Sequence, residues 1–408
     1  MQLTKYKLRE ILDVTRGASL SGEYYATEGE YIRLTCGNFD YQNNCFKKNK
    51  SKDNLYYVGD FKPEFLMEEG DIITPLTEQA IGLLGSTAII PESGKYIQSQ
   101  DVAKIICKED MLDKDFAFYL ISSTLVKQQL SAAAQQTKIR HTSPDKIKGC
   151  TVWIPELSEQ KRIGKLLRSI DRKIELNRAI NQNLEAMAKQ LYDYWFVQFD
   201  FPNEEGKPYK LSGGAMVWSE ELKREIPCEW TTTTLGKECE MYQPKTLGLS
   251  ELDDNAQYKV YGANGVIGKF HSYNHEDSEI AMACRGNSCG IINRTAPFSW
   301  ITGNAMVIKM RNSKIHNEYI KQALRYANVA GAISGSGQPQ LTRENLSGVK
   351  LCKPIDEVLM KFTRLVSQIV KLQLQNHSKI EFLIKQRDEF LPLLMNGQVS
   401  VNSDLSDD

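Results

Sequence analysis

The chain has 408 residues, of which 41% are hydrophobic and 25% charged, as in an ordinary globular protein of two to four domains. Basic and acidic residues number 51 each, and this zero net charge argues against a protein that holds nucleic acid alone through a strongly basic surface. The N-terminal stretch MQLTKYKLRE lacks the apolar segment of a signal peptide, and no apolar run is long enough to span a bilayer. The nine cysteines form no CxxC pair. We therefore expect a cytoplasmic protein with reduced thiols.

Residues 1–156 are expected to form a mixed α/β domain. Short β-like runs, among them IRLTCGNFDY, GDIITP and DVAKIIC, are separated by Gly, Asn and Pro. One helical stretch, DKDFAFYLISSTLVKQQLSA, follows them. Short strands with a single helix of this kind predict a compact α+β unit.

Residues 157–200 are predicted to form a long helix with one apolar seam. Alternating steps of four and three residues meet large apolar side chains at most positions, a pattern typical of a coiled coil. Pro202 ends the pattern. The seam positions in this helix are Ile163, Leu167, Ile170, Ile174, Asn177, Asn181, Leu184 and Leu191.

The second half of the chain repeats this order after a connector, residues 201–224, that is dense in Gly, Pro and charge. Residues 225–354 read as a second mixed domain, with runs such as YKVYGANGVIGKF, SEIAMAC and NAMVIKM. Residues 355–397 read as a second long helix, and 398–408 as a flexible tail. The seam positions in the second helix are Phe362, Val366, Ile369, Asn376, Ile380, Leu383 and Phe390.

A constant offset of 199 residues relates the two halves. SPDKIKGCTVWIP (143–155) corresponds to TRENLSGVKLCKP (342–354), and the seam residue Asn177 falls on Asn376. Polar seam residues near both helix midpoints favour an antiparallel pair, although a parallel one remains open. We therefore predict an α+β fold in which two mixed domains are separated by two long helices. These form an antiparallel coiled coil with an internal pseudo-twofold.

The sequence shows little that would support catalysis. It has no P-loop, nucleophile elbow or methyltransferase adenine motif, and Gly335-x-Gly337 lacks the third glycine of a dinucleotide fingerprint. His271, His275, Cys284 and Cys289 fit no standard zinc spacing. We expect a binding module with no catalytic residue, no metal site and no cofactor.

Three stretches resemble the specificity subunit of type I restriction–modification systems. They are LSEQKRIGKLL at the start of the first helix, YDYWFVQFDFPNEEGKPYKLSGGAMVW at its end, and GSGQPQLTRENLSGVKLCKP before the second. The resemblance implies that 1–156 and 225–354 are target-recognition domains, each reading one half of a bipartite site in double-stranded DNA. It also implies that the helices set the spacing and dock two methyltransferase subunits, which recruit restriction and motor subunits. The second helix departs from the pattern, because it opens with IDEVLMKF.

If methyltransferase partners clamp the duplex, the chain needs only local patches for DNA. Lysine-rich and amide-rich loops supply such patches, and Arg suits guanine edges whereas Asn and Gln suit adenine edges. The candidate DNA-binding residues are Lys47, Lys48, Lys50, Lys138, Arg140, His141, Lys146, Arg285, Asn287, Gln338, Gln340, Thr342 and Arg343.

Three alternatives stay open on sequence alone. The chain could serve a methylation-only or related bipartite restriction–modification system. It could be a coiled-coil adaptor with no nucleic-acid role. It could also be an enzyme in its own right, which the missing catalytic constellation argues against.

Overall fold

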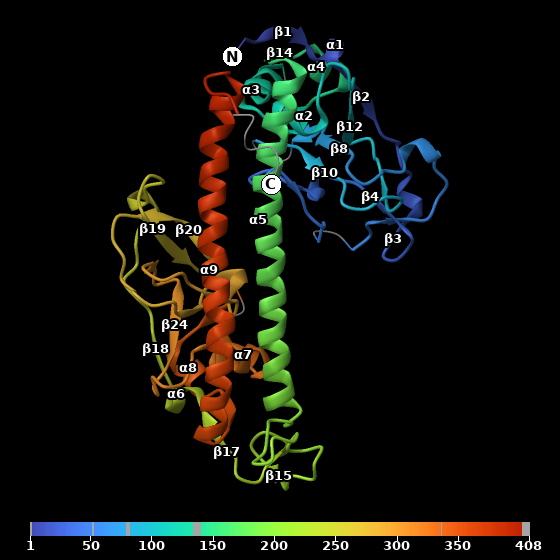
Figure 1. The fold of residues 1–408 in the computed structure, drawn as a ribbon. Helices are drawn as coiled ribbons and strands as arrows, with labels where there is room; N and C mark the ends of the chain where they lie inside the picture. Colours follow the sequence, from blue (N-terminus) through green and yellow to red (C-terminus); the bar gives the residue numbers. More distant parts are fainter. Residues whose placement is uncertain (1, 51–52, 79–81, 134–139, 336, 402–408) are drawn as a thin grey trace. The chain divides into compact units, whose positions relative to one another are not determined.

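The structure is a computed structural model, and it describes residues 2–50, 53–78, 82–133, 140–335 and 337–401. It confirms the predicted α+β class. The chain divides into two compact units, Met1–Glu175 with Ile380–Asp408 (unit 1) and Leu176–Lys379 (unit 2). The long helices α5 (Leu157–Tyr192) and α9 (Asp356–Met395) contribute residues to both units (Figure 1).

The core of unit 1 is built on a four-stranded sheet in the order β10-β8-β12-β2, antiparallel throughout. Every residue of β8 is buried, as expected of a central strand covered on both faces. Helix α2 begins where the side chain of Asp113 accepts a hydrogen bond from the N–H of Phe116 at 2.9 Å, and it packs into this core. These elements are β2 (Leu12–Arg16), β8 (Ile72–Pro75), β10 (Ala88–Ile89), β12 (Val102–Cys107) and α2 (Lys114–Ile121).

Smaller elements surround this sheet. Strand β1 pairs with β14, β4 lies between β7 and β11 in a second sheet with β3, and β13 pairs with β9. The bounds are β1 (Thr4–Lys7), α1 (Leu8–Ile11), β3 (Tyr25–Ala26), β4 (Tyr31–Arg33), β5 (Phe39–Asp40), β6 (Cys45–Phe46), β7 (Tyr56–Tyr57), β9 (Thr77–Glu78), β11 (Tyr96–Ile97), α3 (Thr124–Ala133), β13 (Arg140–His141), α4 (Pro144–Gly149) and β14 (Thr151–Ile154).

Unit 2 is built on an antiparallel sheet in the order β18-β24-β21-β22, with helix α7 in its core. A three-stranded sheet, β20-β19-β23, and the pair β17–β27 complete it. The bounds are β15 (Met216–Ser219), β16 (Arg224–Pro227), β17 (Thr231–Thr234), α6 (Leu235–Glu238), β18 (Cys239–Tyr242), β19 (Tyr258–Gly262), β20 (Gly265–Phe270), β21 (Ile280–Ala283), β22 (Ile292–Arg294), β23 (Trp300–Ile301), β24 (Ala305–Met310), α7 (Glu318–Tyr326), β25 (Ile333–Ser334), β26 (Gln340–Leu341), α8 (Arg343–Ser347) and β27 (Lys350–Lys353).

The two units repeat one order of elements, which confirms the duplication. Each has a central antiparallel sheet, and each has a second sheet with one parallel pair, β4–β11 in unit 1 and β19–β23 in unit 2. Each closes with a short helix, α4 or α8, followed by a strand that pairs with an earlier strand of the same unit, β1 in unit 1 and β17 in unit 2. The repeat in the amino-acid sequence is therefore accompanied by a repeat of the strand topology.

In unit 1, α5 and α9 pack antiparallel to each other. Ile174 clusters with Ile380 near the middle of the seam, whereas Ile163, earlier on α5, shares a core with Leu394, later on α9. Residues with increasing numbers along α5 thus contact residues with decreasing numbers along α9. The seam positions that are buried or packed here are Ile163, Leu167, Ile170, Ile174, Ile380 and Leu383.

In unit 2 the same two helices also pack antiparallel. The Nδ2 of Asn376 donates to Oδ1 of Asn181 at 3.1 Å, and Nδ2 of Asn181 donates to the carbonyl of Gln373 at 3.3 Å. Further along α5, the ring of Tyr192 lies 6.2 Å from that of Phe362. Asn177 is half-buried, and the other seam positions that are buried or packed here are Asn181, Leu184, Leu191, Phe362, Val366, Ile369 and Asn376.

The structure departs from the sequence-based expectation at three places. Phe390 is 39% exposed, because a helix has 3.6 rather than 3.5 residues per turn and a seam of alternating four- and three-residue steps drifts around it; Arg387, which the same spacing reaches, is buried as expected. Helix α5 ends at Tyr192 with one π-helical turn after it, and α9 passes through Pro392 to Met395. The β15–β16 hairpin crosses the expected boundary between the connector and the second domain.

Acid should destabilise unit 2 through His316. Burial, together with the positive charges of Arg294 and Lys321, lowers the pKa of His316 from 6.5 to about 4, and the negative charge of Glu318 opposes this shift only in part. The neutral ring accepts the N–H of Glu318 at 3.0 Å through Nδ1, and the backbone N–H of His316 donates to the Thr363 hydroxyl at 3.1 Å. Because the folded pKa lies below the unfolded value, this stability is complete above about pH 6.5 and is lost as the pH falls to about 4, by at most about 3 kcal/mol.

Thermal unfolding measured across this pH range tests the expectation. His316→Asn keeps a short polar side chain that does not titrate, so its stability should change less with pH over the same range. An equally steep loss in the variant would contradict the assignment to His316.

Candidate nucleic-acid interface

In unit 2 the structure joins two stretches that lie more than fifty residues apart in the sequence. Arg285 follows the end of β21, and its backbone forms a bridge with Gln340 of β26. The N–H of Gly286 donates to the carbonyl of Pro339 at 2.9 Å, and the N–H of Leu341 donates to the carbonyl of Cys284 at 3.0 Å. The predicted stretches 285–287 and 338–343 therefore form one surface, which we call the unit 2 loop junction (284–287 with 338–343).

Two glycines shape the backbone at this junction. Gly286 has φ +71°, in the region that side chains other than Gly rarely adopt. At Gly335, with φ +89°, an added Cβ would lie 2.6 Å from the carbonyl oxygen of Gln338. Both glycines thus shape the backbone that presents the neighbouring polar side chains.

Most of the predicted residues at this junction point to solvent. Thr342 differs, because it is half-buried and its hydroxyl accepts the N–H of Asn345 at 3.2 Å as the N-cap of α8. Its hydroxyl therefore has a structural task. The exposed residues are Arg285, Asn287, Gln338, Gln340 and Arg343.

Unit 1 has an equivalent junction. There the strand that follows β8 is β9, and its Thr77 and Glu78 pair with His141 and Arg140 of β13. The N–H of Thr142 donates to the carbonyl of Leu76 at 2.9 Å, which matches the bond between Leu341 and Cys284. We call residues 76–78 with 140–142 the unit 1 loop junction.

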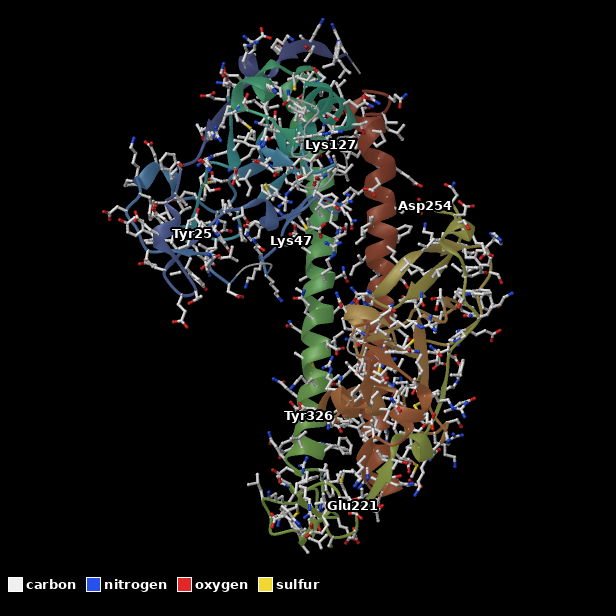
Figure 2. The ribbon with its side chains drawn as sticks, turned by 180° about the vertical axis from the view of Figure 1, so that it is seen from behind. Tyr25, Lys47, Lys127, Glu221, Asp254 and Tyr326 are labelled. Carbon is white, nitrogen blue, oxygen red and sulfur yellow. The ribbon has the colours of Figure 1, made fainter. Side chains whose placement is uncertain are left out.

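The lysine-rich stretch of unit 1 adjoins this junction through a short turn. The N–H of Lys47 donates to the carbonyl of Asn38 at 3.0 Å, and in the same turn the thiol of Cys36 lies 3.3 Å from the carbonyl oxygen of Thr77. Lys47 (Figure 2), Lys48 and Lys50 are all exposed. Two predicted patches of the first half are thus brought together.

Arg140 is held in place rather than free. Its Nη1 lies 3.7 Å from Oε2 of Glu78 and donates to the Ser131 hydroxyl at 3.1 Å. Glu78 is buried, and its Oε1 accepts the backbone N–H of Gly82 at 2.7 Å. The ion pair thus orders the junction. His141 and Lys146 are exposed nearby in sequence, whereas Lys138 lies outside the described residues.

Comparison with known proteins accounts for this arrangement. Residues 2–186 match the family model of the type I restriction modification DNA specificity domain. The MjaIX specificity subunit of Methanocaldococcus jannaschii is 22% identical over 334 residues, 74% of this chain and 73% of that protein. The putative MjaX specificity subunit of the same organism is 22% identical over 375 residues, 86% and 84% of the two chains. The chain is thus similar to type I specificity subunits over most of its length, and residues 2–186 match the family's DNA specificity domain.

A solved structure shows the same fold as this chain. The crystal structure of the type I restriction–modification S subunit from M. genitalium matches it with a TM-score of 0.62 at 18% identity. The match covers 97% of this chain and 96% of the other. Both units and both long helices therefore have counterparts in one solved family member.

Two further findings concern metal sites and membrane spans. Within the described ranges, no group of three or more His, Cys, Asp or Glu side chains is placed to hold a metal ion. His275 instead contacts Tyr242 at 2.9 Å, and Cys284 is buried beside Gln243. No helix in the part of the chain that the structure describes is long and apolar enough to cross a membrane.

Sequence reasoning missed Thr77 and Glu78 as residues of the candidate interface. The signal was present, because GDIITP and SEIAMAC were both read as strands in matching places of the two halves. The strands β8 and β21 are related by an offset of 208 rather than 199, so a comparison at constant offset does not align the residues that follow them.

Proposed function

We propose that this chain is the DNA-specificity subunit of a type I restriction–modification complex. Each recognition domain reads one half of a bipartite DNA target through its loop junction. The paired helices set the gap between the half-sites and hold two methyltransferase subunits, which carry the catalysis. The observation that supports this most strongly is that the same junction of two loops occurs once in each unit.

The side chains at the two junctions fit different bases. Arg285 and Gln340 in unit 2 suit guanine and adenine edges in the major groove, whereas Thr77 and His141 occupy the matching positions in unit 1. Lys47 and its neighbours add positive charge, which is suited to phosphates. Two junctions with different side chains predict two different half-sites and thus an asymmetric target.

Exposed apolar side chains on the long helices support a docking role for them. In unit 2, Leu176, Ile180 and Met187 of α5 are 61%, 38% and 52% exposed. Their spacing of four and seven residues places them along one face of the helix. Leu365 and Leu372 of α9, seven residues apart, are also exposed. An apolar stripe of this kind is suited to helices of a protein partner.

Methylome sequencing of cells with and without this gene tests the proposal. The expected result is a split motif with methylated adenines that disappears when the gene is deleted. No split motif in either strain would reject it in favour of an adaptor without a nucleic-acid role. Restriction of unmodified target DNA in the same cells would distinguish a complex with a nuclease from a methylation-only system.

Replacing Arg285 by alanine should relax only one half-site. If its guanidinium contacts a base edge, the loss should cost about 1–3 kcal/mol at that position of the target. The other half-site should keep its sequence, because the junction in unit 1 is unchanged. The methylated motif of cells carrying Arg285→Ala measures both effects at once.

Two variants serve as controls for this prediction. Lys237→Ala removes an exposed charge on α6 of unit 2, away from the junction, and should leave the motif unchanged. Lys47→Ala with Lys48→Ala should weaken binding uniformly and reduce its salt dependence, as expected of phosphate contacts. Equal relaxation of both half-sites by Arg285→Ala would mean that the domains do not read independently.

A further inference from the structure

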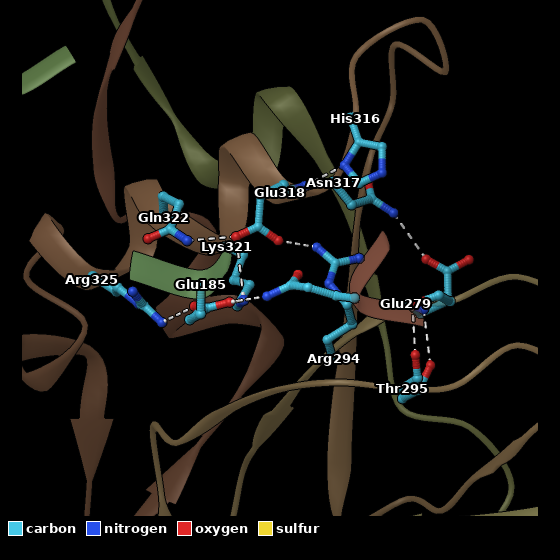
Figure 3. Close-up of polar contacts among 12 residues, drawn as sticks. Glu185, Glu279, Arg294, Thr295, His316, Asn317, Glu318, Lys321, Gln322 and Arg325 are labelled. Carbon is cyan, nitrogen blue, oxygen red and sulfur yellow. Dashed lines mark hydrogen bonds and ion pairs between the residues drawn. The ribbon is translucent and has the colours of Figure 1, made fainter. Parts of the chain in front are cut away.

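A single carboxylate of α5 connects unit 2's recognition domain with both long helices. Both carboxylate oxygens of Glu185 accept hydrogen bonds from Nζ of Lys321 on α7, at 2.9 and 2.8 Å. Nη2 of Arg325, one turn further along α7, donates at 2.6 Å. Nε2 of Gln373 on α9 donates at 3.3 Å. Figure 3 shows these contacts converging on Glu185.

The environment of Glu185 favours its charged form. Burial alone would raise the pKa of Glu185, but Lys321, Gln373 and Arg325 outweigh burial and lower it to about 2. The carboxylate is therefore ionised at neutral pH and holds two cations of the domain. The side chain of Lys321 is only 8% exposed, so solvent screens its contact with Glu185 weakly.

The contacts continue from Glu185 into the sheet that carries the loop junction. Lys321 also pairs with buried Glu318, which is bonded to Arg294 of β22. Asn317 directly precedes Glu318 in the chain, and its Nδ2 donates at 3.0 Å to Oε2 of Glu279. Glu279 in turn directly precedes β21. Strand β21 ends two residues before Arg285. Polar contacts thus connect α5 with α7, and the start of α7 with β22 and with the residue before β21, the strand that presents the reading loop (Figure 3).

Unit 1 repeats this device with different residues. Asp171 on α5 accepts the hydroxyl of Tyr119 on α2 at 2.5 Å, and Nη1 of Arg387 on α9 donates to it at 2.9 Å. Helix α2 occupies the place in unit 1 that α7 occupies in unit 2. In both units, one α5 carboxylate therefore receives a donor from the recognition domain and a donor from α9. Because two different residues make the same kind of connection in the two units, we infer that they have the same role.

We propose that Glu185 and Asp171 are positioning residues that fix the orientation of each recognition domain on the helix pair, and thereby the gap length that the complex accepts. This rests on the proposed function, because a gap exists only in a bipartite DNA target. Neither carboxylate touches DNA in this proposal. A domain that pivots on the helices would still read its own half-site, but at a variable distance from the other.

Glu185→Gln tests the proposal in the full chain assembled with its methyltransferase partner. The amide keeps the shape and size of the side chain but loses the charge that holds Lys321 and Arg325. The expected result is that both half-sites stay the same, while methylation at sites whose gap is one base pair longer or shorter rises about fivefold, the effect of a ~1 kcal/mol change. The methylated sites in cells carrying each variant give this readout directly.

Two further variants separate positioning from stability. Arg325→Gln removes the more exposed cation, so its fold is at less risk, and it should broaden the gap in the same direction. Glu175→Gln, an exposed carboxylate on the same helix, should change nothing. A merely destabilised chain would lose methylation equally at all gap lengths. If the wild type methylates a split motif but neither Glu185→Gln nor Arg325→Gln broadens its gap, the positioning role is rejected. If the wild type gives no split motif, the proposed function itself fails.

Discussion

Four residues added to each long helix should lengthen the gap between the two half-sites by about two base pairs. Each added residue extends a helix by about 1.5 Å, so four add about 6 Å, close to two steps of 3.4 Å along DNA. The place for the insertion is where the units divide, after Glu175 in α5 and after Lys379 in α9. Repeating residues 172–175 and 380–383 there adds one apolar seam residue to α5, a second Ile174, and two to α9, a second Ile380 and Leu383.

The methylated motif of cells carrying the lengthened chain measures this effect. The half-sites should stay the same, because neither loop junction is changed. Four residues added instead after Glu205, in the exposed turn of the connector, should leave the gap at its original length. A lengthened helix pair that still selects the original gap would show that the helices do not set the distance.

A fragment that ends near Asn203 should pair with a second copy of itself only weakly. The offset of 199 residues places Asn177 where Asn376 would stand, so the polar contact with Asn181 can form between two copies. However, the position of Arg387 is taken by Ala188, which leaves the buried Asp171 without its cation. Removing one partner of a buried ion pair costs about 3–5 kcal/mol.

Ala188→Arg in the fragment should restore that cation from the second copy and strengthen the dimer. Light scattering over a range of protein concentrations measures the change, and Ala186→Arg, two residues away on the helix, is the matched control. With its methyltransferase present, the dimer should select a symmetric target, the first half-site and its inverted repeat. Ala188→Arg without effect on dimerisation would contradict the equivalence of the two helices.

The helices and the duplication could be predicted from sequence because both depend on regular spacing. Repeated apolar positions mark a helix seam whatever surrounds it, and a constant offset marks a repeat. The end of the seam was less predictable, since small differences between 3.5 and 3.6 residues per turn accumulate along about forty residues. At Phe390 an expected seam residue is therefore exposed to solvent, whereas Arg387, three residues earlier in the same spacing, is buried.

The candidate interface could be predicted only in pieces. The residue composition of the loops at Arg285 and Gln340 predicted each of them separately as a DNA contact. Their position next to each other depends on backbone hydrogen bonds between segments that are distant in sequence, which no local pattern encodes. Glu185 was missed for a related reason. A single Glu on a long helix is usually a solvated residue, and its importance comes from cations more than 130 residues away.

The aromatic end of α5 has a consequence for the synthesis of this protein. Trp195 and Phe196 are buried against Phe362, so their cover is made only after the whole second domain has left the ribosome. Until then Phe196 has only part of its cover, from Trp230 and Tyr319. Chains that fold domain by domain from the N-terminus are prone to aggregate at such a stage. We therefore expect the half-made chain to aggregate more readily than the finished one.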